Sequence, residues 1–252
     1  MVIHTYGNRE DKVILLLQPM GFSGKEMTDH FLPHFKKSYF IIAPDMGNHG
    51  DDHSDFKSMD KEMEQLHAWL AENDITYIDL LLGLSMGAGG ALILMQYKDL
   101  KFGEIYLDGC PVARMGFIMR KIFAPVLIWV KNSMVKDLKK ANAEYMERYG
   151  EVLGSQMGQN FLKFSDESIR NIGDLCVRGN IYEFDAATQK RMYFDWGSKE
   201  DYYKNSTPLV RKKYPDAHVI IRENLAHCEY MAKYPEKYVS FIEEHIPAEQ
   251  EK

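Results

Sequence analysis

The chain has 252 residues, of which 45% are apolar and 27% charged, a composition typical of a globular protein that buries a sizeable core. Its net charge of -6 argues against a surface that neutralises the phosphates of a nucleic acid. Three cysteines argue against a disulfide framework and for a reducing, cytoplasmic location. We expect no signal peptide, and the longest apolar run, 122–130, is about half of a membrane span.

Short apolar runs alternate with longer amphipathic patterns, which predicts a mostly parallel, doubly wound α/β sheet. The first two strands flank a Gly7-Asn8 turn, so we expect them to form a hairpin. The expected strands are 2–6, 12–17, 39–43, 75–82, 102–107, 190–196 and 217–221. The expected helices are 25–35, 59–73, 86–96, 200–214 and 235–245.

The alternation stops in the middle of the chain. An apolar stretch at 116–130 leads into a charged helical pattern at about 133–149, with no clear strand nearby. We therefore expect one α/β core formed by residues 1–110 and 186–252, interrupted by a mainly helical insertion at 111–185.

The segment Gly83-Leu-Ser-Met-Gly follows one predicted strand and precedes a helix rich in small residues. The pattern G-x-S-x-G in that context predicts a nucleophile elbow, a sharp turn that exposes the Ser85 hydroxyl. The same glycines fit a dinucleotide-binding turn, with Asp108 as a ribose-binding carboxylate, or a purely structural turn. Dinucleotide turns normally follow the first strand, whereas several strands come before Ser85, so the elbow is favoured.

A serine nucleophile needs a base, and the base needs a carboxylate to orient it. On an elbow scaffold these residues follow the serine in the order acid, then histidine. Of the histidines after Ser85, only His227 lies in a predicted loop beyond the last strand. It is the candidate base, although such a histidine could instead cap the final helix.

The acid is expected after the preceding strand. Glu200 and Asp201 both lie beyond Gly197, on the turn into the next helix, whereas Asp195 falls within the strand. Either carboxylate could instead be a solvated group at a helix N-terminus, where acidic residues are common.

These features together resemble the α/β-hydrolase family along nearly the whole chain, as a serine hydrolase or esterase with a helical cap. In this family the acid commonly stands three residues after the glycine, which favours Glu200, and a cap is inserted where this chain has 111–185. The matching segments are Gln18-Pro-Met-Gly after a strand, Asp45 to Gly50, the elbow, Gly197-Ser-Lys-Glu and Ala226-His227.

The resemblance also implies an oxyanion hole made by the backbone amides of Met20 and Met86. Family members usually have His-Gly where this chain has Gln18-Pro19. Proline has no N–H, so the oxyanion hole depends on whether the Met20 amide faces the site.

The apolar stretch at 116–130 has two compatible interpretations: it packs the insertion on the core, or it lines a pocket above Ser85. The residues we expect in the substrate pocket are Phe22, Met115, Phe117, Met119 and Trp129. His49, His53 and three nearby aspartates resemble a metal site, but a polar loop is the simpler interpretation, and we expect neither metal nor cofactor.

The sequence thus predicts a serine hydrolase that cleaves a small carboxylic ester or a related acyl compound through an acyl-enzyme. A serine at the elbow argues against reactions that proceed through an aspartyl ester. Two alternatives stay open: a weakly catalytic ligand-binding receptor on the same fold, and an NAD(P)-dependent short-chain dehydrogenase. We expect a small-molecule partner, no nucleic acid and no membrane span.

Overall fold

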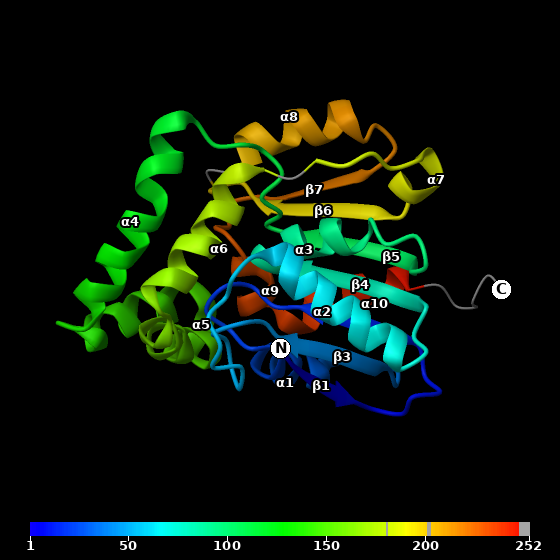
Figure 1. Ribbon diagram of the computed structural model, residues 1–252, viewed down its shortest axis with the longest axis horizontal. Coiled ribbons are helices and arrows are strands. Elements are labelled where there is room, and N and C mark those ends of the chain that lie inside the picture. The colour runs from blue at the N-terminus through cyan, green and yellow to red at the C-terminus, as the bar shows by residue number, and fades with distance from the viewer. Residues whose placement is uncertain (180, 201–202, 247–252) are drawn as a thin grey trace.

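The computed structural model describes residues 1–179, 181–200 and 203–246. A seven-stranded sheet crosses the molecule, with the strand order β1-β3-β2-β4-β5-β6-β7 (Figure 1). Its strands are β1 (Val2–Tyr6), β2 (Val13–Leu17), β3 (Phe40–Asp45), β4 (Tyr77–Leu84), β5 (Lys101–Asp108), β6 (Met192–Gly197) and β7 (His218–Arg222).

All strands of the sheet are parallel except the edge strand β1. Strand β1 pairs antiparallel with β3, Val2 lying opposite Asp45, and every other neighbouring pair is parallel. The predicted hairpin is therefore wrong, because β3 lies between β1 and β2. All six residues of β3 are buried, and a strand buried in this way needs partners on both edges to satisfy its backbone. The predicted mostly parallel, doubly wound sheet is confirmed.

Helices cover both faces of the sheet. Along β2, Leu15 and Leu17 pack in a core with α2 (Met59–Glu72) and α3 (Met86–Leu94). Ile14 and Leu16 pack on the other face with α1 (Gly24–Phe31) and α10 (Pro235–His245). This alternation follows from the two-residue period of a strand and makes both faces apolar. The helices are α1 (Gly24–Phe31), η1 (Leu32–His34), α2 (Met59–Glu72), α3 (Met86–Leu94), α8 (Tyr203–Lys213), α9 (Glu229–Lys233) and α10 (Pro235–His245).

Between β5 and β6 the described chain forms helices α4 (Phe117–Met134), α5 (Leu138–Lys163), α6 (Asp166–Arg178) and α7 (Ala186–Gln189). Helix α5 is interrupted at Gly150, whose φ of 77° lies in the left-handed region that glycine tolerates. Figure 1 shows α4, α5 and α6 gathered at one end of the sheet. The boundaries 1–110, 111–185 and 186–252 stay a prediction. Within the described residues, no helix is both long and apolar enough to cross a membrane.

Candidate active site

Ser85 stands at a sharp turn between the end of β4 and the start of α3. Its φ is 51°, an uncommon value for a residue with a side chain, and its N–H donates to the Asp108 carbonyl at 2.7 Å. A Cβ on Gly87 would lie 2.2 Å from the Leu17 carbonyl oxygen, and one on Gly83 would lie 2.6 Å from the Ala88 Cα. The two glycines therefore allow the close backbone approach that the turn requires.

The structure brings Ser85, His227 and Glu200 together from three separate loops. The Ser85 Oγ lies 2.7 Å from His227 Nε2, and His227 Nδ1 lies 2.6 Å from Glu200 Oε2. Glu200 is buried, and its other oxygen accepts the Gly197 N–H at 2.6 Å. The alternative acid, Asp201, lies outside the described residues. This arrangement has the nucleophile–base–carboxylate geometry of a catalytic triad.

Backbone hydrogen bonds join the loop that carries Glu200 to the loop that carries His227. The Ser198 N–H donates to the Arg222 carbonyl and the Lys199 N–H to the Leu225 carbonyl, each at 2.9 Å. The Glu229 carboxylate accepts the Ala226 N–H at 2.8 Å, directly before His227. The two loops are thus fixed relative to each other by the backbone, which limits the freedom of the acid and the base.

His227 is an imidazole with two opposing influences on its pKa. Burial lowers its pKa, whereas contacts with Cys228 and Glu200 raise it, and the balance lies well above the ordinary value of 6.5. Burial raises the pKa of the Cys228 thiol to about 12, so this thiol is neutral near pH 7. The Glu200 carboxylate is therefore the charged partner that favours the imidazolium form of His227.

A buried polar network lies behind the triad and was not anticipated from the sequence. Asp195 accepts hydrogen bonds from the Tyr106 hydroxyl and, at 2.8 Å, from Arg222 Nε. Burial raises the pKa of Asp108 well above its usual range, and the nearby Asp195 and Glu200 carboxylates raise it further. A ribose-binding carboxylate has to face a ligand, whereas Asp108 is only 4% exposed at the end of β5. This burial removes the feature that favoured the dehydrogenase.

Gln18 explains how the segment before the site is anchored. It is fully buried, and its amide lies between the Pro44 carbonyl oxygen, at 2.7 Å, and the Met46 N–H, at 2.9 Å. The side chain therefore ties the end of β2 to the end of β3. Met20 and the proline before it line the same cavity as Ser85, and Met86 is the first residue of α3, where backbone N–H groups lack helical partners.

A cavity of about 480 Å³ opens beside the candidate triad. Phe22 lines it, as the sequence predicts, whereas Met115, Phe117, Met119 and Trp129 do not. Phe117 and Trp129 are 67% and 68% exposed. None of these four residues lines this cavity, because Met115 precedes α4 and the helix faces the site with other residues of its apolar stretch.

The cavity wall formed by the inserted helices was largely missed. The residues of α4 that line it are Phe123, Leu127 and Val130, spaced by three and four positions along one helical face. Phe123 falls within the apolar stretch noted in the sequence. Apolar residues are spread over most of this helix, so the sequence does not show which face is turned toward the cavity. The remaining lining residues from the inserted helices are Tyr145, Arg148, Tyr149, Met157, Phe161 and Cys176.

The histidine-rich loop after β3 is held by protein contacts. His49 is buried, and burial lowers its pKa to about 4. Asp52 pairs with the N-terminal ammonium group at 2.7 Å. These contacts agree with the interpretation of this segment as a polar structural loop.

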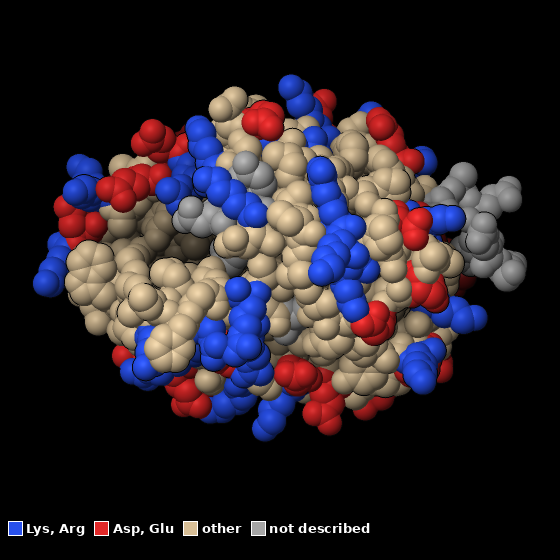
Figure 2. Space-filling view, turned by 90° about the horizontal axis from the view of Figure 1, so that it is seen from above, with Lys and Arg blue, Asp and Glu red and all other residues tan. Residues whose placement is uncertain are grey.

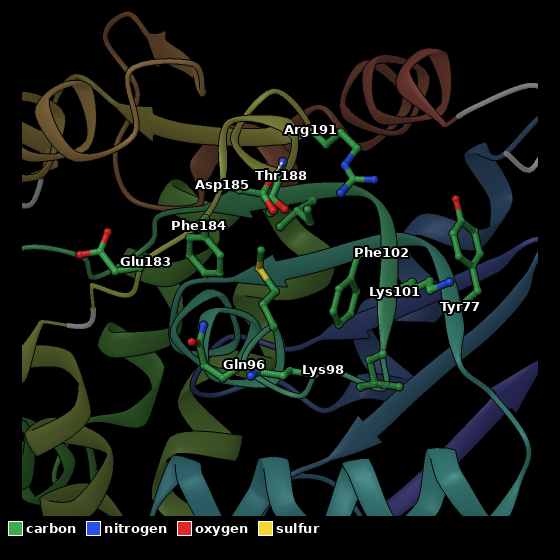
Figure 3. A pocket seen from close by; sticks show the side chains of 13 residues that line it. Tyr77, Gln96, Lys98, Lys101, Phe102, Glu183, Phe184, Asp185, Thr188 and Arg191 are labelled. Atoms are coloured by element: carbon green, nitrogen blue, oxygen red, sulfur yellow. Dashed lines mark hydrogen bonds between the residues drawn. The ribbon is translucent and has the colours of Figure 1, made fainter.

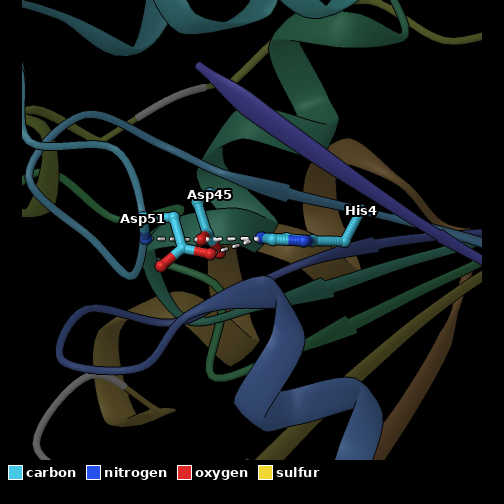
Figure 4. A group of neighbouring side chains, drawn as sticks. All are labelled: His4, Asp45 and Asp51. Carbon is cyan, nitrogen blue, oxygen red and sulfur yellow. Dashed lines mark hydrogen bonds and ion pairs between the residues drawn. The ribbon is translucent and has the colours of Figure 1, made fainter.

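Figure 4 shows a neighbouring group in which His4, Asp45 and Asp51 place one ligand atom each within 4.8 Å of one another. The Asp45 carboxylate already accepts the Gly24 N–H at 2.7 Å, the Asp51 N–H at 2.9 Å and a contact from His4 at 2.9 Å. Asp51 itself is exposed. The Asp45 carboxylate thus joins β1 to the loop after β3 through oxygen atoms that already accept hydrogen bonds.

A second cavity, of about 540 Å³, lies at the N-terminal ends of the parallel strands, whereas Ser85 follows a C-terminal end (Figure 3). Tyr77 and Lys101 contribute from the first residues of β4 and β5, and Arg191 from just before β6. Because parallel strands all run in the same direction, this cavity is separated from Ser85 by the length of the strands. Its lining contains none of the three candidate triad residues.

Comparison with solved structures gives matches over nearly the whole chain. A protein from Desulfitobacterium hafniense, provisionally placed in the α/β hydrolase family, is 19% identical, with 98% of this chain and 100% of that chain covered and a TM-score of 0.75. An esterase from Exiguobacterium antarcticum is 13% identical, with 97% and 94% covered and a TM-score of 0.74. A bromoperoxidase from Bacillus anthracis is 13% identical, with 96% and 94% covered and a TM-score of 0.72.

No protein-family model matches the sequence, and no curated protein matches it significantly. The structural matches cover the sheet and the inserted helices together. The chain therefore has the α/β-hydrolase fold, as the resemblance in the sequence predicts.

Proposed function

We propose that this protein is a serine hydrolase that cleaves a small carboxylic ester or a related acyl compound. The observation that carries the proposal is the continuous contact from Ser85 Oγ through His227 to Glu200, at 2.7 and 2.6 Å. Two hydrogen bonds of this length align a nucleophile with a base and the base with an orienting anion.

In the proposed reaction, the Ser85 oxygen attacks the acyl carbon while His227 Nε2 accepts the hydroxyl proton. Glu200 holds His227 by its Nδ1–H, which keeps Nε2 available as the base. The alcohol leaves with the proton from His227, and the resulting acyl-enzyme is hydrolysed by water that the same imidazole activates. Asp201 is the alternative acid.

The backbone amides of Met20 and Met86 are the proposed oxyanion donors. Donors placed where negative charge develops stabilise the transition state, and loss of one typically costs about 10² to 10³ in rate. The buried Gln18 amide supports this role, because it fixes the backbone that leads into Met20. The proline at position 19 removes its own N–H but leaves that of Met20.

The cavity favours an acyl compound with a substantial apolar portion. Its wall combines the aliphatic and aromatic side chains of α4 and α5 with Phe22, and Arg148 and Lys199 are its cationic members. A volume of about 480 Å³ accommodates a small molecule, because ligand pockets typically measure about 300 to 1,000 Å³.

Two other functions are less well supported. A receptor on this fold would need the cavity but not a base within hydrogen-bond distance of Ser85. A dehydrogenase would need a ribose-binding carboxylate, and Asp108 is buried. The cytoplasmic location stays a prediction; the described cysteines are unpaired, as a reducing compartment requires.

Labelling with a fluorophosphonate probe tests the proposal directly. The wild-type protein should form a covalent adduct that Ser85→Ala does not form, and only the wild type should hydrolyse p-nitrophenyl butyrate. Ser155→Ala, which changes an exposed serine on α5, is a matched control and should label normally. Absence of a Ser85-dependent adduct overturns the hydrolase, and NADH binding in its place supports the dehydrogenase.

A further inference from the structure

Helix α4 carries an apolar stripe on its outer face. Ile118 is 71% exposed, Ile122 42%, Val126 47% and Trp129 68%. Their spacing of three or four residues places them on one side of the helix. In Figure 2, uncharged side chains gather at the end of the molecule where Figure 1 places α4, with Lys and Arg side chains around them and some acidic groups near the edge.

The stripe is not the face that packs on the protein. A neighbouring face of α4 carries Phe123, Leu127 and Val130, which line the cavity beside Ser85. A helix at the surface of a water-soluble domain normally presents polar residues outward. An exposed apolar patch with a polar rim is typical of a surface that contacts another apolar phase or molecule.

The charged side chains of the segment that carries the stripe are all of one sign. From Gly109 to Lys136 the sequence contains no Asp or Glu, although the chain as a whole has a net charge of -6. The Lys131 ammonium group forms an ion pair with the Asp166 carboxylate, at 2.5 Å. No ion pair joins Arg114, Arg120, Lys121 or Lys136 to a residue in the described part of the chain, and all four are exposed.

We propose that α4 binds the surface of a membrane that contains anionic lipids. The apolar stripe would enter the boundary between headgroups and acyl chains, and the surrounding cations would face the lipid phosphates, as in helices that lie in a membrane interface. The helix lies on the membrane and does not cross it, in keeping with the lack of a membrane-spanning helix among the described residues.

Charge also argues against a second copy of this chain as the occupant. A symmetric dimer through α4 would bring together two copies of a segment, 109–136, whose charged side chains are all cationic. Like charges brought together in this way repel, whereas an anionic lipid surface attracts both sets. A lipid surface therefore satisfies the apolar stripe and its cations at once.

Vesicle flotation tests the proposal. Wild-type protein should float with vesicles of phosphatidylcholine and phosphatidylglycerol, and the bound fraction should be about ten times smaller with pure phosphatidylcholine. At 0.5 M salt the bound fraction should also fall strongly, because charges are then screened beyond roughly a few Å. The double variant Ile122→Ser/Trp129→Ser should lose at least about tenfold in binding to the anionic vesicles. Arg120→Gln/Lys121→Gln should lose binding to anionic vesicles in particular.

The matched control is Leu32→Ser/Tyr234→Ser, which removes two apolar side chains that are 44% and 43% exposed far from α4 in the sequence. This control should bind vesicles like the wild type. Trp129 adds an optical readout, because its fluorescence should shift to the blue on anionic vesicles and the shift should be lost in Trp129→Phe. Folding of every variant is checked by circular dichroism.

Equal binding of the α4 variant and the wild type overturns the proposal, as does binding that ignores lipid charge. Sedimentation equilibrium provides a separate test. If the wild type is a dimer that Trp129→Ser abolishes, and if it does not bind vesicles, the stripe serves self-association. That result overturns the proposal of membrane binding. The inference goes beyond the proposed hydrolase, and hydrolysis of p-nitrophenyl butyrate in the absence of vesicles reports on Ser85 independently.

Discussion

Replacement of Glu200 by glutamine tests the candidate triad most directly. In the structure one carboxylate oxygen accepts the Gly197 N–H at 2.6 Å and the other faces His227 Nδ1 at 2.6 Å. A glutamine has a single acceptor oxygen at its end. If that oxygen keeps the Gly197 contact, the amide NH₂ meets His227, and the imidazole must turn its lone pair toward position 200.

The consequence is the wrong tautomer. His227 Nε2 then carries the proton and cannot accept one from Ser85. A loss of the correctly oriented, charge-stabilised base lowers kcat by about 10³ to 10⁴, or about 4 to 5.5 kcal/mol of transition-state stabilisation. The pH dependence should change as well. Because Glu200 raises the pKa of His227, wild-type activity should rise with pH through a pKa above 6.5, and in Glu200→Gln the residual activity should rise at a lower pH.

The assay is kcat/KM for p-nitrophenyl butyrate from pH 5 to 10. Glu223→Gln, an exposed carboxylate on the loop before His227, is the control and should behave like the wild type. Retention of more than about a tenth of wild-type activity in Glu200→Gln contradicts the assignment. If Asp201→Asn causes the larger loss, the acid is Asp201 and the register after Gly197 is shifted by one residue.

Four further changes test other parts of the structure. Gly87→Ala should abolish p-nitrophenyl ester hydrolysis and destabilise the fold in urea denaturation, because its Cβ would lie 2.2 Å from the Leu17 carbonyl oxygen; normal activity would contradict the tight turn. Gln18→Leu should lower the free energy of unfolding by about 1 to 3 kcal/mol, because it leaves the Pro44 carbonyl and the Met46 N–H without their partner. Burial raises the pKa of Glu104 to about 7, so its cost to stability is absent below the unfolded pKa near 4.5 and grows as the pH rises toward 7. Glu104→Gln should therefore stabilise the protein by roughly 1 to 2 kcal/mol at pH 8, after allowance for partial exposure, and leave it unchanged at pH 4, and urea denaturation at both values checks this. Phe123→Ala should change the preference for acyl chain length across a panel of p-nitrophenyl esters, whereas Phe117→Ala should leave it unchanged; the opposite result would contradict the observed orientation of α4.

Local patterns predicted the elements of the α/β core well. The last helix was expected at 235–245 and forms as α10 over the same residues, since a proline begins it and apolar residues repeat along one face. Ser85 and His227 were proposed as candidates from chemistry that short segments carry: two glycines around a serine, and a histidine in a loop beyond the last strand. The placement of Glu200 relied on the resemblance and on its distance from Gly197.

Local sequence patterns did not predict which distant segments are in contact. The Gly7-Asn8 pair indicated a turn correctly, yet β1 crosses to pair with β3 rather than with β2. A turn signal does not report which strand the chain joins next. The buried Asp108 and the network around Asp195 were missed for a related reason, because their burial results from strands that meet only in the folded sheet.

Helix α4 shows what the sequence lacks when apolar residues spread over most of a helix. An amphipathic helix such as α2 reveals its buried face, because polar residues mark the other one. In α4, Phe117 and Phe123 are chemically alike, and only the packed structure shows that the second faces the cavity and the first faces outward. The same ambiguity is informative, because a helix that needed only to cover the cavity would carry an apolar stripe on one face. The outer stripe requires an explanation of its own, and the cations around it, without acids from Gly109 to Lys136, favour a lipid surface over a loosely specified core.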